Sequence, residues 1–158
     1  MTTAGWRFGP PGEADFEPLL ALRVDVMREH LERVFRYDPE RACRYFREAF
    51  DEPGMRLILV GGERAGCVGF RIGGDEIKLD SFYLERHLHN SGLGTTILKV
   101  LLAEADTLGL PVRLEVLNGS KADRFYLRHG FVKLSQDEIE GEYERPVPRM
   151  DRALPARS

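Results

Sequence analysis

Apolar residues recur every three or four positions over residues 16–34, which predicts an amphipathic helix. Asp38 followed by Pro39 is typical of a helix start, because the Asp side chain accepts first-turn amides and proline suits the first helical position. The apolar residues from Ala42 to Ala49 give this second, short helix one buried face. Two helices are therefore expected early in the chain, after a short strand at residues 6–8.

Alternating or continuous apolar runs at residues 55–60, 65–72 and 76–84 predict three strands. Glycine pairs at 61–62 and 73–74 separate them, and glycine permits the positive φ of tight hairpin turns. This part of the chain is therefore expected to form an antiparallel meander.

The second half of the chain alternates helices and strands. An apolar stripe from Ile97 to Leu108 predicts a helix that ends at Gly109, and the period-two pattern at residues 112–116 predicts a strand. Ser120 and Asp123 resemble a capping box and indicate another helix before Gly130. Final strands are expected at residues 131–134 and 143–145. The fold class is a layered α/β (α+β) fold, with residues 1–146 in one domain and 147–158 as a loosely held tail.

Composition narrows the function. The chain has 158 residues, 42% of them hydrophobic and 31% charged, with a net charge of -3, so nothing favours binding to nucleic acid. No apolar run approaches the ~20 residues that span a membrane. Cys43 and Cys67 are too few for a cysteine zinc site or a disulfide framework, so neither a metal nor an oxidising compartment is expected. These features, together with an N-terminus unlike a signal peptide, predict a cytoplasmic protein.

The most informative segment joins a strand, a glycine-containing loop and a helix start at residues 82–98. Backbone amides in such a loop can converge on one point, where the helix N-terminus adds partial positive charge, so the place suits a phosphate or pyrophosphate. A Gly-x-Gly before a helix is also common as a plain turn. The segment has neither the Gly-Lys-Ser/Thr ending nor the third glycine of the best-known nucleotide loops.

Two motifs carry a resemblance to one family. Residues 89–94, His-Asn-Ser-Gly-Leu-Gly, resemble the Q/R-x-x-G-x-G/A acetyl-CoA loop of the GNAT superfamily of N-acyltransferases. Residues 118–131 resemble its N-x(3)-A-x(2)-F-Y-x(3)-G-F signature at the usual distance. The order of elements along nearly the whole chain agrees, which favours the family over a plain turn. His89 replaces the usual glutamine or arginine, so the backbone contacts carry over more directly than a charged side-chain contact.

The resemblance implies a mixed, mostly antiparallel central sheet that splays apart where acetyl-CoA binds. The pantetheine arm would pair with the strand end at residues 82–84, and the pyrophosphate would bind the amides of residues 91–95. Tyr126 would give a proton to the leaving CoA thiolate; its alternative role is packing behind the cofactor. The implied cofactor-binding residues are Phe82, Tyr83, Leu84, His89, Asn90, Ser91, Gly92, Leu93, Gly94, Thr95, Asn118 and Phe125.

The general base is the least defined residue. Asp80 shares a strand face with Phe82 and could accept the amine proton, although a salt bridge to Lys78 is equally consistent with its position. Glu115 on the next strand is a second candidate. His30 and His129 are candidates by pKa alone, and His129 at a helix C-terminus suits the helix dipole.

The resemblance predicts an N-acetyltransferase that uses acetyl-CoA and a primary amine of a small molecule or peptide, which attacks directly in a ternary complex. Family members commonly dimerise, so a homodimer is expected. A non-catalytic CoA-binding module and a structural domain without CoA are the alternatives. Arginines of the early helices could attract a carboxylate on the acceptor, but several of them form i,i+4 pairs with glutamates, so a solvated face is the simpler interpretation.

Overall fold

The computed structural model describes residues 5–34 and 38–148, with side chains described outside residues 29–34. Within these residues the strands form one sheet of seven, in the order β1-β2-β3-β4-β5-β7-β6. The strands are β1 (Trp6–Gly9), β2 (Met55–Val60), β3 (Glu63–Ile72), β4 (Ile77–Leu84), β5 (Val112–Leu117), β6 (Val132–Gln136) and β7 (Glu140–Arg145). The helices are η1 (Glu13–Asp15), α1 (Phe16–Val34), α2 (Pro39–Asp51), η2 (Arg86–Leu88), α3 (Leu93–Leu108) and α4 (Ala122–Leu127).

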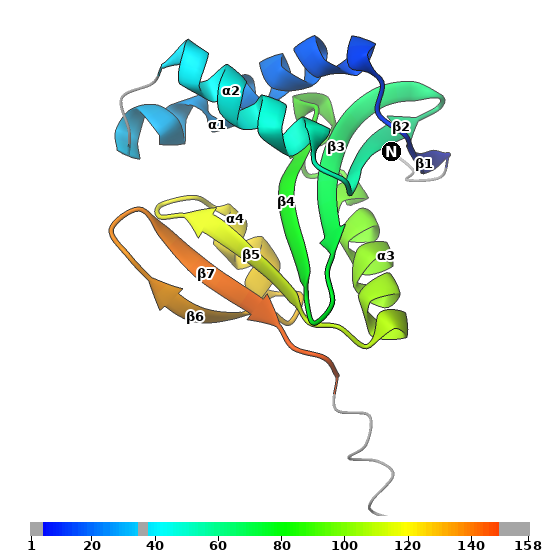
Figure 1. Ribbon diagram of the computed structural model, residues 1–158, viewed down its shortest axis with the longest axis vertical. Helices are drawn as coiled ribbons and strands as arrows, with labels where there is room; N and C mark the ends of the chain where they lie inside the picture. The colour runs from blue at the N-terminus through cyan, green and yellow to red at the C-terminus, as the bar shows by residue number, and fades with distance from the viewer. Residues whose placement is uncertain (1–4, 35–37, 149–158) are drawn as a thin grey trace, which may run out of the picture.

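Helices cover both faces of the sheet (Figure 1). The apolar faces of α1 and α2 pack with Met55, Leu57 and Cys67 in one cluster. A larger cluster on the opposite face joins α3 and α4 to the sheet through residues such as Ile58 and Leu79. Leu57 and Ile58 fall in different clusters because successive side chains of a strand point to opposite faces.

The sheet opens between β4 and β5. These are the only parallel neighbours among the described strands, and they pair only at Ile77 with Val112 and Lys78 with Arg113. Beyond Lys78 the two strands diverge, as Figure 1 shows. The splayed, mostly antiparallel sheet implied by the resemblance is therefore present.

The predicted elements are all present, with small differences in their ends. Asp38 caps α2 as expected and accepts from the amides of Glu40 (3.0 Å) and Arg41 (3.4 Å). The capping box is wrong: the Ser120 hydroxyl accepts from the amide of Ala122 at 3.1 Å, and Asp123 accepts from Arg124 at 2.7 Å. Since α4 begins at Ala122, Ser120 lies too early to bond the third helical amide. Residues 149–158, most of the expected tail, lie outside the described residues.

Candidate functional site

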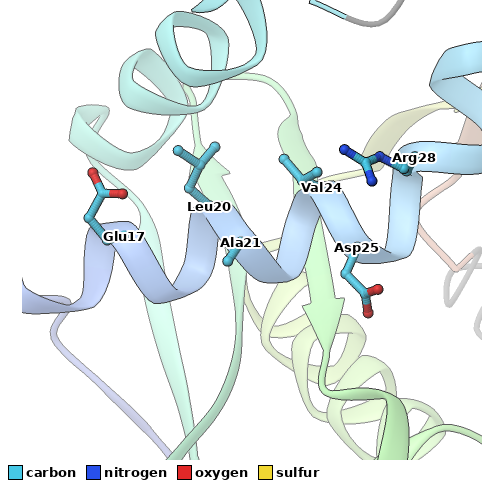
Figure 2. Close-up of a pocket in the computed structure, with 6 residues that line it drawn as sticks. All are labelled: Glu17, Leu20, Ala21, Val24, Asp25 and Arg28. Carbon is cyan, nitrogen blue, oxygen red and sulfur yellow. The ribbon is translucent and has the colours of Figure 1, made fainter. Parts of the chain in front are cut away.

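The opening between β4 and β5 contains a cavity of about 660 Å³, a volume typical of small-molecule sites. Its walls come from β4, β5, the helices α1, α2 and α4, and the start of β7. A smaller hollow of about 390 Å³ runs along α1, and its lining, from Glu17 to Arg28, belongs to that one helix (Figure 2). A single helix cannot surround a ligand, so the cavity at the sheet opening is the candidate site.

Hydrogen bonds of Ser91 connect the glycine loop, residues 89–94, to the residues before it and to the start of α3. The Ser91 hydroxyl donates to the carbonyl of Leu88 at 2.6 Å and accepts from the amide of Leu93 at 3.3 Å. Asn90 and Gly92 have φ values of +62° and +90°, a region in which glycine is unstrained. Gly92 is the N-cap of α3, so this loop sets the position of the helix N-terminus.

The N-terminus of α3 presents free amides. The amide of Leu93 bonds Ser91 and that of Thr96 bonds the Gly92 carbonyl at 3.1 Å. Within the described residues, the amides of Gly94 and Thr95 between them have no protein partner. Such amides, with the partial positive charge of the helix end, suit a phosphate group. Residues 91–95 therefore fit the predicted pyrophosphate site, because they leave backbone amide donors free.

His89 and Phe125 connect the loop to its neighbours. The Nε2 atom of His89 lies 2.8 Å from the carbonyl oxygen of Leu84. A carbonyl oxygen can only accept a hydrogen bond, so Nε2 is the donor. His89 thus holds the loop against the end of β4. A Cβ built on Gly94 would lie 3.7 Å from Leu84 Cδ1 and 3.8 Å from Phe125 Cζ. Phe125 therefore packs beside the helix end that the resemblance assigns to the cofactor.

A bulge in β4 faces the cavity. Ser81 and Phe82 together stand opposite Val68 of β3, and Ser81 has a φ of +50°. A bulge of this kind re-aims the backbone and leaves a residue out of the ladder. Near it, a Cβ on Gly66 would lie 2.0 Å from the Tyr83 carbonyl oxygen, so only glycine fits there. No pattern in the sequence indicates this bulge, although Phe82, Tyr83 and Leu84 were assigned to the site.

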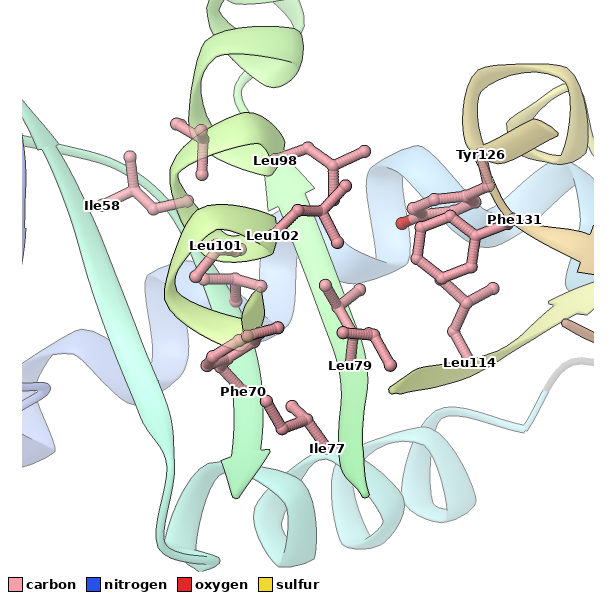
Figure 3. Close-up of a cluster of buried hydrophobic side chains, with 14 of the residues drawn as sticks. Ile58, Phe70, Ile77, Leu79, Leu98, Leu101, Leu102, Leu114, Tyr126 and Phe131 are labelled. Atoms are coloured by element: carbon pink, nitrogen blue, oxygen red, sulfur yellow. The ribbon is translucent and has the colours of Figure 1, made fainter. Parts of the chain in front are cut away.

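Tyr126 lies on α4 with 8% of its surface exposed, and its ring lines the cavity. The ring packs edge-on against Phe131, with centroids 5.3 Å apart, and projects from α4 toward β4 (Figure 3). Burial, together with the nearby Tyr83, raises the pKa of the Tyr126 phenol well above its ordinary value. The phenol therefore stays protonated and can donate a proton or a hydrogen bond.

Asp80 forms a salt bridge with Arg71, not with Lys78. The Arg71 guanidinium donates to both carboxylate oxygens, at 3.1 and 2.9 Å, and only 8% of Arg71 is exposed. A Cβ on Gly69 would lie 2.4 Å from the Asp80 carboxylate, so this glycine makes room for the ion pair. The sequence analysis expected a salt bridge but named the wrong partner, because Arg71 lies on the adjacent strand.

Glu115 and Glu140 form a pair of carboxyls on the cavity wall, on β5 and β7. Burial raises the pKa of Glu140 to about 7, helped by the hydrogen bond and the charge of Glu115 and opposed by Lys78. Glu115 was a candidate base from its strand. Glu140 was not a candidate, because the sequence does not show that β7 pairs with β5.

The structure also shows the contacts of Asn118 and His129. The side-chain amide of Asn118 donates to the carbonyl of Asp137 at 3.0 Å and so binds the β6–β7 turn. The Nδ1 atom of His129 lies 2.7 Å from the Phe125 carbonyl at the end of α4, the position expected for a helix-dipole contact. The side chain of His30 lies outside the described residues.

Arg23 is a cavity residue that the sequence analysis missed. It lies on α1 with 6% exposed, and it stacks over the ring of Tyr45, 4.9 Å from the centroid. Burial raises the pKa of Tyr83 to about 12, and the charge of Arg23 and its hydrogen bond with the Tyr83 phenol counteract part of this effect. Arg23 follows the buried Leu22 along α1. A charged residue next to a core position was the one feature of the sequence that could have indicated its burial.

No helix among the described residues is long and apolar enough to cross a membrane. No cluster of three or more potential metal-ligating residues occurs in that same part of the chain.

Comparisons with known proteins point to one family. The family model described as "Acetyltransferase (GNAT) family" matches residues 21–131. No curated protein matches the sequence significantly.

Several solved structures share the fold. The PaiA N-acetyltransferase from Thermoplasma acidophilum, in complex with coenzyme A, superposes with a TM-score of 0.71 at 16% identity, covering 92% of this chain and 99% of that one. An acetyltransferase from Thermus thermophilus has a TM-score of 0.71 at 20% identity, covering 93% and 100%. A GNAT family acetyltransferase from Staphylococcus aureus has a TM-score of 0.68 at 13% identity, covering 89% of this chain and 98% of that one. At these identities the likeness shows the fold.

Proposed function

The chain belongs to the acetyltransferase (GNAT) family, and we propose that it transfers an acetyl group from acetyl-CoA to a primary amine of a small molecule or peptide. One observation supports this most: the free amides of Gly94 and Thr95 begin a helix next to Leu84, at the end of the strand β4 that lines the cavity. A long cofactor could reach from those amides into the opening of the sheet.

Acetyl-CoA would supply an activated thioester carbonyl. Its pyrophosphate would bind the amides of residues 91–95. Its pantetheine arm would pair with β4 beyond Lys78, where β5 no longer does. The bulge at Ser81 and Phe82 lies on this stretch, and a backbone amide near Phe82 would stabilise the developing oxyanion.

The amine must lose a proton before it attacks, because an alkylammonium of pKa near 10.4 leaves only about one molecule in 10³ neutral at pH 7. Both oxygens of Asp80 already accept from Arg71, so the proposal assigns the proton to the Glu115–Glu140 pair. A carboxyl whose pKa is about 7 is well matched to this task.

As the nitrogen–carbon bond forms and the carbon–sulfur bond breaks, the leaving thiolate would take the proton of Tyr126. Attack is direct, without an acyl-enzyme. Neither cysteine lines the cavity, and burial raises the pKa of Cys67 to about 12. Both cysteines are free thiols, and on this ground we also propose a cytoplasmic location.

Calorimetry with coenzyme A and acetyl-CoA, followed by thiol release with a panel of amines, tests the proposal. Binding together with amine-dependent thiol release is expected. Folded protein that gives no heat with either compound would refute both the activity and the cofactor site. Binding without thiol release from any amine would favour a non-catalytic CoA-binding module instead.

A further inference from the structure

The guanidinium of Arg23 is a buried charge that lacks a counterion in the described part of the chain. Only 6% of Arg23 is exposed. No hydrogen-bond acceptor among the described residues is within reach of its Nε and Nη1 atoms, which are fully buried, and no carboxylate there forms an ion pair with it. Glu52, which follows the last residue of α2, approaches Arg71 instead, at 3.9 Å.

The neighbours of Arg23 pack against its guanidinium but give its Nε and Nη1 atoms no hydrogen-bond acceptor. The ring of Tyr45 lies 4.9 Å from the guanidinium carbon, a distance at which a cation interacts with the face of an aromatic ring. That contact uses no N–H group. Tyr45 is 60% exposed, unusual for so large a ring, and it lines the cavity together with Arg23 and Tyr83.

A buried charge without a counterion is costly, and a bound anion would remove the cost. Guanidinium groups are the preferred protein partners of carboxylates and phosphates, because their N–H groups match the oxygens of these anions. Arg23 lines the cavity, so a ligand there can reach it. One guanidinium balances one negative charge, which favours a carboxylate over a phosphate group carrying nearly two.

Two carboxyls line the far wall of the same cavity. Glu115 and Glu140 line it from β5 and β7, whereas Arg23 and Tyr45 line the cavity from α1 and α2. The exposed carboxylates of Asp38, Glu48 and Glu52 line its α2 side as well, so Arg23 is the buried charge on that side. In Figure 1 these helices and strands stand on opposite sides of the opening. The cavity therefore suits a molecule that is negative at one end and positive at the other.

We infer that the acyl acceptor is a small amino carboxylate, whose carboxylate binds Arg23 and whose amine faces Glu115 and Glu140. This inference rests on the proposed acetyl transfer and narrows its acceptor. It disfavours a protein N-terminus that begins with a non-acidic residue, because the α-carboxyl of that residue is part of a peptide bond.

Matched acceptors provide the first test. Free L-amino acids, β-alanine and 4-aminobutyrate are compared with their own carboxamides, using thiol release from acetyl-CoA. At least one free acid is expected to have a kcat/KM about 100-fold above that of its carboxamide. Equal values across every pair would overturn the inference while leaving acetyl transfer itself intact. The comparison uses the wild-type protein and does not depend on any variant folding.

Variants then locate the effect. Arg23→Met should raise KM for the preferred acid about 100-fold, change kcat only a few-fold and leave the carboxamide unaffected, and Arg23→Lys should restore part of the preference. Arg44→Gln on α2 is the matched control, because Arg44 is exposed and does not line the cavity. A loss in Arg23→Met that is equal for acid and carboxamide would show a structural role and refute the assignment.

A binding measurement separates this inference from the proposed activity. Calorimetry in the presence of coenzyme A compares each N-acetylated acid with its carboxamide. Selective binding of the acid that is lost in Arg23→Met supports the site even if no acetyl transfer occurs. Absence of binding by every acid would overturn it.

Discussion

The guanidinium of Arg71 binds both carboxylate oxygens of Asp80, with Nε–Oδ2 at 3.1 Å and Nη2–Oδ1 at 2.9 Å. The same guanidinium donates to the carbonyls of Ala49 (2.8 Å) and Glu52 (2.9 Å) at the end of α2. One side chain of β3 therefore joins α2 to β4, two elements that line the cavity. A carboxylate held in this way serves better as an anchor than as a mobile proton acceptor.

Replacing Arg71 should destabilise the protein far more than replacing a surface arginine. Arg71→Met leaves Asp80 and the α2 carbonyls without their donor, and we expect the free energy of unfolding to fall by about 2 to 4 kcal/mol. Urea denaturation measures this change. Arg64→Met is the control, because Arg64 forms an exposed ion pair with Asp15 at 2.9 Å, and a loss of about 1 kcal/mol or less is expected. Equal losses in the two variants would contradict the anchoring role.

A bulky side chain at Gly94 should block the cofactor without unfolding the protein. A Cβ there meets Leu84 and Phe125 only at ordinary contact distances, so Gly94→Val should alter stability by about 1 kcal/mol or less. Its branched side chain would stand beside the free amides, and the Kd for coenzyme A should rise at least about 10-fold. Calorimetry and thermal unfolding measure the two effects.

Thr107→Val provides the control at the other end of α3, where the threonine hydroxyl bonds the Ala103 carbonyl at 3.1 Å. It should leave the Kd for coenzyme A unchanged. If Gly94→Val bound coenzyme A as tightly as the wild-type protein, the pyrophosphate would not bind at these amides.

The fold could be predicted from local signals because each element carries its own. The cap at Asp38 and Pro39, the αL glycine at Gly109 and the alternation at residues 112–116 all act within a few residues of the chain. The glycine loop is equally local, since Ser91 and Gly92 bond to residues beside them. Local physical chemistry was therefore sufficient for the order of elements and for the glycine loop that precedes α3.

The acceptor side of the cavity could not be predicted in the same way, because it depends on contacts between distant segments. Arg71 reaches Asp80 only through the register of β3 with β4, in which Gly69 stands opposite Asp80. Glu140 meets Glu115 only because β7 inserts between β5 and β6. Arg23 enters the cavity through the packing of α1 across the sheet. None of these relationships leaves a pattern in the sequence at the residues concerned.

Removing the Tyr126 hydroxyl should slow the chemical step. Tyr126→Phe keeps the ring that packs against Phe125 and Phe131, so the protein should fold normally and its KM for acetyl-CoA should change little. Without the acid, kcat should fall about 10- to 100-fold. Steady-state kinetics measure this effect, with Tyr143→Phe as a control because Tyr143 is a buried tyrosine that does not line the cavity. An unchanged kcat and pH profile in Tyr126→Phe would leave Tyr126 with a packing role only.

Neutralising Glu140 should stabilise the protein at high pH and impair its activity. The folded protein raises the pKa of this carboxyl from 4.5 to about 7, mainly by burial and also by its bond to Glu115. Between these values the folded state holds a proton that the unfolded state has released, so stability falls as pH rises through this window. Glu140→Gln removes that cost. Solvent screening limits the gain to about 1 kcal/mol at pH 8, with no gain at pH 4.

Thermal unfolding at both pH values, beside kcat with the preferred amine, tests Glu140→Gln in a way that separates two roles. We expect the Tm to rise by about 2 to 4 °C at pH 8 only, while kcat falls at least about 10-fold. Glu138→Gln, in the exposed β6–β7 turn, should change neither quantity. If Glu140 stabilised the fold, neutralising it would lower the Tm of the protein. If it is a proton acceptor with an unfavourably raised pKa, neutralising it raises the stability of the protein and lowers its activity. A lower Tm at pH 8, or an unchanged kcat, would therefore count against Glu140 as part of the base.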